Sequence, residues 1–286
     1  MAPRLGVVAR IAAQAGAAGV AVWAGWVEPR RLVVRHDALE LAHWPASLDD
    51  LKVGVIADIH SGVPHMGRDA IARAVARLAA EEPDLVLLLG DYLDGSPLFG
   101  GRLAPEAVAS ELGRLRAPLG TMAVLGNHDW VGGGHRMWVA LERNGITVLE
   151  NRAVPVDARG TRLWIAGLAD VRHRRADPEG TLADVPPGEP VLVLSHDPDA
   201  FPHVPERVAL TLAGHLHGGQ VAIPLLRRFV LPSWYGERYA RRHVVDAGRR
   251  LYVSSGLGTS GLPVRLLAPP EVAVLTLRSL PAEPRR

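Results

Sequence analysis

The sequence contains no cysteine among its 286 residues. Disulfide bonds, thiolate zinc sites and thiol nucleophiles are therefore excluded, and any transition-metal site must use His, Asp, Glu or Asn side chains. Lysine is nearly absent too, because Lys52 is the only one. The formal net charge is only +2, and the basic excess lies in residues 203–286. That excess could attract an anionic substrate or a membrane surface, or form a solvated arginine-rich face.

One long run, residues 11–27, contains no charged side chain and lies between Arg10 and Glu28. Its seventeen residues are about the shortest helix that crosses a bilayer. No small-residue cleavage site follows it, so we predict an uncleaved anchor at the cell membrane rather than a removed signal peptide. The alternative is an Ala-rich helix packed on a cytoplasmic catalytic domain. Arginines flank both ends of the run, so the positive-inside rule does not assign a side of the membrane.

The rest of the chain alternates strand-like and helix-like segments. Strand-like runs occupy 51–57, 85–89, 121–125, 162–166, 191–194, 208–212, 251–253 and 272–277, and most of them are continuous apolar runs typical of strands covered on both faces. Amphipathic patterns predict helices over 69–80, 105–115 and 135–143. We therefore expect an N-terminal hydrophobic segment over 1–28, an extended lead-in over 29–50, one catalytic domain over 51–280 and a tail over 281–286.

Side chains that can bind a metal directly follow five of these runs. They are Asp58 and His60, Asp91, Asn127, His196, and His215 with His217. Ligands of open α/β sheets bind beyond the carboxyl ends of the strands, so we expect these side chains to converge on one crevice. A single His or Asp at a strand end is more often a hydrogen-bonded residue or a helix cap. Five in series predict a metal site, because buried charge without a partner is costly.

The order of these residues resembles the motif order of the calcineurin-like metallophosphoesterase family. The matching motifs are Asp58-Ile59-His60, Gly90-Asp91, Gly126-Asn127-His128-Asp129, His196 and Gly214-His215-Leu216-His217. The resemblance covers about residues 51–277 and implies an α/β fold, a four-layer α/β/β/α sandwich of two mixed sheets flanked by helices. The hydrophobic N-terminus and residues 214–220 and 255–265 are similar to a bacterial branch of the family. Some members of that branch hydrolyse UDP-2,3-diacylglucosamine in lipid A synthesis, and others are phosphodiesterases.

The resemblance also implies a centre of two divalent metal ions. One ion would be held by Asp58, His60 and His217. The other would be held by Asn127, His196 and His215, with Asp91 bridging the two. Two such ions polarise a phosphoryl oxygen and provide a hydroxide for in-line attack on phosphorus. The ligand set leaves the metal open among Mn, Fe, Zn and Co.

Three further residues are candidates for roles around this centre. We expect His128 to donate a proton to the leaving oxygen. Asp129 either orients the His128 ring or caps a loop or helix, and the sequence does not separate these alternatives. Gln220 is expected to contact the substrate at most weakly.

The residues and the resemblance together predict a hydrolase of phosphodiester or pyrophosphate bonds, acting on a membrane-associated lipid-linked nucleotide such as UDP-2,3-diacylglucosamine. The alternatives are a soluble phosphodiesterase or nuclease, and a catalytically silent metal-binding scaffold. Residues 227–250 hold seven arginines among aromatic residues, which could grip a nucleotide, a lipid headgroup or single-stranded nucleic acid, or form a solvated loop. Because no nucleic-acid-binding motif accompanies them, we expect neither a nucleic-acid nor a protein partner.

Overall fold

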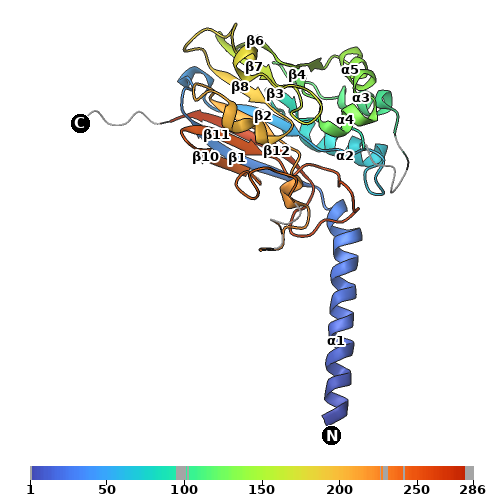
Figure 1. Cartoon of the computed structure of the whole chain (residues 1–286). Coiled ribbons are helices and arrows are strands. Elements are labelled where there is room, and N and C mark those ends of the chain that lie inside the picture. The colour runs from blue at the N-terminus through green and yellow to red at the C-terminus, as the bar shows by residue number, and fades with distance from the viewer. Residues whose placement is uncertain are drawn as a thin grey trace, which may run out of the picture.

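The structure, a computed structural model, describes residues 2–94, 101, 103–225, 227, 231–240 and 242–280. The expected tail over 281–286 lies outside the described residues, as do Arg228, Phe229 and Arg241 of the arginine-rich segment. Two six-stranded sheets face one another, with helices on their outer sides (Figure 1). The predicted sandwich of two mixed sheets flanked by helices is confirmed.

The first sheet has the strand order β1-β12-β2-β3-β4-β5. Its strands are β1 (Val33–Leu41), β2 (Leu51–Ile56), β3 (Leu85–Leu88), β4 (Thr121–Ala123), β5 (Thr147–Val148) and β12 (Glu271–Ser279). Strands β2 to β5 run parallel, and β12 is antiparallel to β2. The outer face is covered by α2 (Arg68–Ala79), α3 (Pro105–Leu112) and α5 (Gly134–Arg143). These helices match the three amphipathic patterns, since α2 buries Ile71, Val75 and Leu78.

The lead-in expected over residues 29–50 contains a complete strand. All nine residues of β1 pair in parallel with β12, so this segment belongs to the first sheet. The strand lies at the sheet edge, and its first six residues are half-buried or exposed. An edge strand with charged side chains such as Arg35 and Asp37 lacks the continuous apolar run that marks the inner strands. Its sequence therefore indicated only an extended segment.

The second sheet has the order β10-β11-β9-β8-β7-β6. Its strands are β6 (Arg152–Ala158), β7 (Thr161–Gly167), β8 (Val191–Leu194), β9 (Leu210–Ala213), β10 (Arg242–Asp246) and β11 (Arg249–Val253). The four inner strands run parallel, whereas β6 and β10 are antiparallel hairpin partners at the edges. The sequence did not predict these two edge strands. Two short helices, α4 (Asn127–Gly132) and α6 (Pro178–Thr181), were also not predicted.

The main core lies between the two sheets. Side chains of a strand alternate between its faces, so Val53 and Val55 of β2 meet Ile165 and Leu192 of the second sheet. Ile56 of the same strand points the other way and packs among the helices. This double burial fixes the register of β2 and hence the place where the strand ends.

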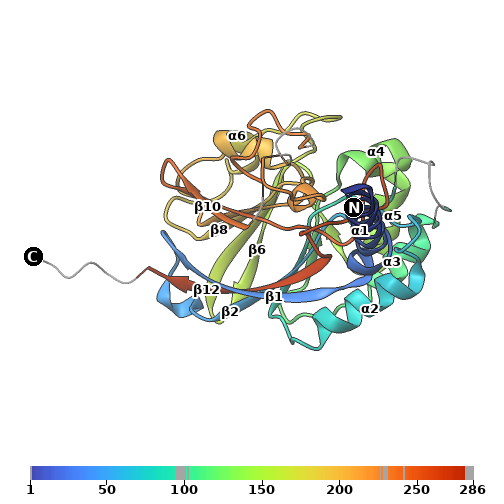
Figure 2. The same cartoon turned by 90° about the horizontal axis from the view of Figure 1, so that it is seen from below.

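The N-terminal helix α1 (Ala2–Val22) projects away from the rest of the molecule (Figures 1 and 2). The stretch Val7–Arg30 has a mean hydropathy of 1.4, and only 6% of its apolar window is buried. By length and composition this helix could cross a membrane. The alternative of an Ala-rich helix packed on the catalytic domain is not what the structure shows. A π-helical turn (Trp23–Val27) and a 3-10 turn (Glu28–Arg30) lead from α1 towards β1.

Candidate metal centre

The structure brings the strand-end residues together at one edge of the sandwich. The seven expected ligands follow β2, β3, β4, β8 and β9 as the sequence indicated. Side-chain donors of Asp58, His60 and His217 lie within 4.8 Å of one another. The same holds for Asp91, His196 and His215. Both groups consist of buried residues. Together they form one cluster below the surface.

Sharp turns direct these side chains into the crevice. Asp58, His60, Asp91, His215 and His217 all have positive φ, between 45° and 68°. Residues other than glycine seldom adopt this left-handed conformation, and its cost is characteristic of functional sites. Gly126 permits the close approach of the Asp91 and Asn127 loops, because a Cβ at that position would lie 2.2 Å from Asp91 Oδ1.

The first group places two imidazole nitrogens face to face. His60 Nε2 lies 3.1 Å from His217 Nε2, and His217 Nε2 lies 3.9 Å from Asp58 Oδ1. The backbone N–H of His215 donates to Asp58 Oδ1 at 2.8 Å. The other oxygen, Asp58 Oδ2, is buried and has no hydrogen-bond partner among the described residues.

The second group is oriented by a backbone carbonyl. His196 Nδ1 lies 2.8 Å from Leu89 O, which can only accept, so this nitrogen carries the proton. His196 Nε2 is left to face Asn127 Oδ1 at 3.0 Å and His215 Nδ1 at 3.1 Å. A histidine that donates through one nitrogen and presents the other is the usual arrangement of a metal ligand.

Asp91 lies between the two groups. Its Oδ2 is 3.4 Å from His60 Nε2 and 3.3 Å from His196 Nε2. Its Oδ1 accepts a hydrogen bond from the backbone N–H of His128 at 2.8 Å. One carboxylate oxygen therefore lies within reach of both clusters.

Burial shifts the pKa values of the acidic and basic side chains in the cluster. Burial raises the pKa of Asp58 to about 6. Burial also disfavours the charged forms of Asp91 and His60, but contacts with groups of opposite charge outweigh it: His196 and then His60 for Asp91, and Asp91 and then Asp94 for His60. The pKa of Asp91 falls well below its usual value, and that of His60 rises to about 9. The Asp91 carboxylate thus requires positive charge beside it.

The residues fit a bound divalent cation. Imidazole nitrogens that face each other at 3.1 Å leave lone pairs opposed unless a proton or a cation lies between them. Buried atoms without a hydrogen-bond partner in the described chain include Asp58 Oδ2 and His215 Nε2. Unpartnered buried groups are costly, and a cation would satisfy them. Nitrogen and oxygen donors of this kind suit Mn, Fe, Co and Zn.

Asp129 has the contacts of a loop cap. It is fully buried, and its oxygens accept backbone N–H bonds from Asp91, Tyr92, Leu93 and Gly126 at 2.8 to 3.0 Å. Of the two alternatives left open by the sequence, these contacts favour the cap. The carboxylate holds the Asp91 loop against the start of α4, which carries Asn127.

His128 and Gln220 lie at the cavity, with different contacts. His128 Nε2 is 3.4 Å from Ser260 Oγ, at the edge of hydrogen-bonding distance. The Gln220 amide accepts from Ser260 N at 2.8 Å and donates to the carbonyls of Ser260 and Leu262. Gln220 therefore fastens the loop around residue 260.

Sequence reasoning missed three polar residues at this edge. Asp94 Oδ1 lies 3.9 Å from His60 Nδ1 and 3.8 Å from His128 Nδ1. Arg172 Nε donates to Asp197 Oδ2 at 2.7 Å, and that oxygen is 3.5 Å from His215 Nε2. A signal was available, because Asp197 directly follows His196 and Arg172 follows β7, another inner parallel strand.

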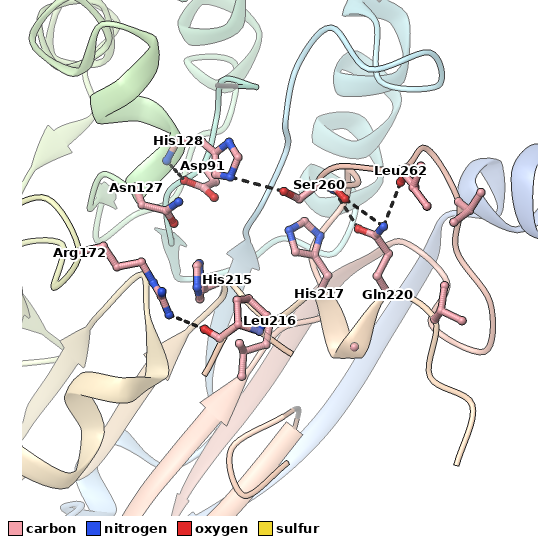
Figure 3. Close-up of a pocket in the computed structure, with 14 residues that line it drawn as sticks. Asp91, Asn127, His128, Arg172, His215, Leu216, His217, Gln220, Ser260 and Leu262 are labelled. Atoms are coloured by element: carbon pink, nitrogen blue, oxygen red, sulfur yellow. Dashed lines mark hydrogen bonds between the residues drawn. The ribbon is translucent and has the colours of Figure 1, made fainter. Parts of the chain in front are cut away.

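The cluster forms the polar end of a cavity of about 400 Å³ (Figure 3). Asp91, Asn127, His128, Arg172, His215 and His217 line this end. The remaining lining is largely apolar and includes Leu216, Val221, Pro232, Leu262 and Val264. The cavity therefore presents a charged end and an apolar wall to any occupant.

The arginine-rich segment makes its own ion pairs. Arg227 contacts Glu237 at 3.0 Å and Arg238 contacts Asp246 at 2.7 Å. Arg249 donates to the carbonyl of Val204 at 2.6 Å. These contacts favour the solvated loop over a nucleic-acid surface, because the pairs reduce the positive charge available to a polyanion.

Comparisons with known proteins agree with the geometry. The family described as calcineurin-like phosphoesterase matches residues 51–231. An uncharacterized metallophosphoesterase of Bacillus subtilis, YkuE, is 30% identical over 260 residues, covering 90% of this chain and 89% of that protein. Phosphodiesterase YaeI of Escherichia coli is 32% identical over 263 residues, covering 88% and 89%. A transmembrane protein with metallophosphoesterase domain from Bos taurus is 30% identical over 254 residues, covering 83% of this chain and 55% of that protein.

Proposed function

The chain belongs to the calcineurin-like phosphoesterase family, a family of metal-dependent phosphoester hydrolases, and we propose that it cleaves a phosphodiester or pyrophosphate bond beside Asp91. The observation that carries the proposal is the position of Asp91 Oδ2, within 3.4 Å of a histidine from each donor group. A carboxylate shared by two donor groups suits a dinuclear centre.

In this proposal two divalent ions share seven ligands. Asp58, His60 and His217 would hold one ion, Asn127, His196 and His215 would hold the other, and Asp91 would serve both. When bound, such ions supply Lewis-acid polarisation of the phosphoryl oxygens and lower the pKa of the attacking water. The protein contributes the rest, which is a fixed donor arrangement, substrate orientation and proton delivery.

Arg172 is placed to orient the phosphate. Its guanidinium lines the cavity and is fixed by Asp197 and by the carbonyl of Pro232. An arginine held in one geometry binds phosphate oxygens directionally. His128 stands on the other side of Asp91 and donates the proton that the leaving oxygen requires.

The proposed substrate is a lipid-linked nucleotide such as UDP-2,3-diacylglucosamine. Support comes from the apolar cavity wall and from α1, which we assign with residues 1–28 to a membrane anchor. A phosphodiesterase and a transmembrane protein among the relatives agree with this reading. The catalytic unit follows the anchor and extends to residue 280.

A substrate panel tests the proposal. The full chain, purified in detergent and loaded with Mn²⁺, would be assayed against a nitrophenyl monoester, a bis-nitrophenyl diester, a nucleotide sugar and UDP-2,3-diacylglucosamine. We expect hydrolysis of the diester and the lipid pyrophosphate, its loss after chelation, and its return with added metal. Metal-loaded protein that cleaves only the monoester, or none of the four, contradicts the proposal.

A further inference from the structure

The base of α1 is bonded to the loop that walls the cavity. Arg265 N donates to Ala24 O at 2.8 Å, and Ala268 N donates to Glu28 Oε1 at 2.8 Å. Glu28 is only 2% exposed, and its other carboxylate oxygen accepts from Trp23 Nε1 at 2.7 Å. The helix is therefore fixed to the catalytic domain at its base, even though its length projects away (Figure 1).

Arg265 extends this connection to the metal centre. It is fully buried, and its guanidinium donates to the carbonyls of Ser255 at 2.8 Å, Gly256 at 3.1 Å and Ala268 at 2.8 Å. Gly256 packs so tightly on Asp58 that a Cβ would lie 2.5 Å from the Asp58 Cβ. Arg265 thus bonds to the turn after α1 through its backbone N–H, and its buried side chain holds the backbone beneath the metal ligands.

The apolar wall of the cavity belongs to the same loop. Val221 forms a β-bridge with Leu266, and Ala222 N donates to Leu266 O at 2.8 Å. Val221 and Val264 both line the cavity. The wall therefore lies within one residue of the hydrogen bond between Arg265 N and Ala24 O, in the turn that follows α1.

Large apolar side chains are exposed around this junction. Trp26 is 64% exposed, Leu262 64% and Leu267 57%. Leu267 lies between Arg265 and Ala268, the two loop residues that bond to the helix base. The Arg30 guanidinium stacks 3.8 Å from the Trp26 ring, and Trp and Arg side chains are characteristic of the membrane–water boundary.

We propose that Trp26, Leu262 and Leu267 form a membrane-contact surface, so that the cavity opens at the level of the lipid headgroups and receives a lipid phosphate ester laterally from the bilayer. The phosphate lies towards Asp91 and the hydrocarbon chains pass Leu262 and Val264 towards the membrane. The inference rests on the proposed function for its chemistry and adds the bilayer as the docking partner. The anchor then does more than tether the enzyme, because its fixed base sets how the cavity faces the lipid.

Single-cysteine labelling tests the contact, since the chain has no cysteine of its own. The full chain carrying Leu267→Cys would be labelled with an environment-sensitive nitrobenzoxadiazole dye and reconstituted into phosphatidylcholine vesicles containing phosphatidylglycerol. Val131→Cys is the matched control, because Val131 is 60% exposed on α4 and is not part of the proposed contact surface. We expect blue-shifted emission and quenching by headgroup-proximal nitroxide lipids at position 267 only. Equal emission at both positions without quenching overturns the proposal.

Hydrolysis by Leu267→Asp gives a second readout. Leu267 has a φ of 60°, which aspartate adopts more readily than leucine, so the variant should fold. We expect its rate on a soluble diester to equal that of the unmodified chain, and its rate on UDP-2,3-diacylglucosamine in the same vesicles to fall on the order of tenfold. Equal rates of the two proteins on the vesicle substrate overturn the membrane-contact surface. Failure of the unmodified chain on the soluble diester instead contradicts the proposed function.

Discussion

At the scale of single residues, Asp91 is the position on which the centre depends most. Replacing it with alanine removes the oxygen within reach of both His60 and His196 and leaves the repulsion between two cations uncompensated. We predict that Asp91→Ala binds less metal and loses turnover on every substrate. Elemental analysis of the purified variant measures the first effect. Full metal content in an inactive variant would exclude the bridging role.

His128 and Asn127 are adjacent, yet we predict different defects. His128→Ala should keep its metal and lose about 10²–10⁴ in rate on esters with poor leaving groups. The loss should be much smaller for nitrophenyl esters, whose leaving group departs without a proton. Asn127→Ala should lose metal affinity and slow all substrates alike. Equal losses of His128→Ala on activated and unactivated esters would show that its ring orients substrate instead.

His65 gives a prediction for the dependence of stability on pH. Burial, together with the positive charges of Arg265 and Arg30, lowers its pKa from 6.5 to about 4. The unfolded chain therefore binds this proton more readily, so the folded state loses stability as pH falls from 6.5 towards 4. The limiting contribution is on the order of 3 kcal/mol. His65→Gln should flatten this part of the stability curve in urea unfolding at a series of pH values. An unchanged slope would show that folding does not lower the pKa of His65.

The positions of the expected ligands were predictable because each follows a strand that is buried on both faces. Such strands appear in sequence as continuous apolar runs, and their ends fix the edge of the sheet where side chains meet. Arg172, Asp94 and Asp197 were missed because their role depends on a neighbour distant in sequence. Asp197 fixes the guanidinium of Arg172, a contact that only the pairing of β7 with β8 brings about. The alternatives for Asp129 were likewise separated only by its four backbone contacts.

At the scale of elements, the inner strands were predictable and the edge strands were not. β1, β6 and β10 all lie at or beside a sheet edge, where one side of the strand meets solvent. Their burial is partial and irregular, so neither a continuous apolar run nor a clean alternation marks them. The contacts that make them strands come from hairpin partners or, for β1, from a strand far along the chain.

The junction after α1 gives a prediction from two truncations. Removing residues 2–22 takes away a helix with few contacts to the domain and should leave the unfolding free energy nearly unchanged. Removing residues 2–28 also takes away Ala24 O and the Glu28 carboxylate, the acceptors for Arg265 N and Ala268 N. The longer truncation should be less stable by roughly 2 kcal/mol. Thermal unfolding of both proteins measures this, and equal melting temperatures would show that the junction bonds contribute nothing.

At the scale of the whole molecule, the anchor assignment predicts where the protein is found in a cell lysate. The full chain should sediment with membranes and resist extraction by alkaline carbonate, because a spanning helix is held by the hydrophobic effect and not by charge. The truncation of residues 2–22 should remain in the supernatant. Immunoblots of the two fractions provide the measurement. A full-length chain recovered in the supernatant without detergent would count against the anchor.

The position of β12 has a consequence for how the protein is made. This strand lies between β1 and β2, yet β1 ends at Leu41 and β12 begins at Glu271. At a synthesis rate of about 5–20 residues per second, the first sheet stays open for roughly 10–50 s after β1 is made. During that interval α1 is already available to the membrane insertion machinery, while the loop that carries Arg265 does not yet exist. The anchor assignment thus predicts that the nascent chain reaches the bilayer before it can assemble the candidate metal centre, while its strand edges are still unpaired.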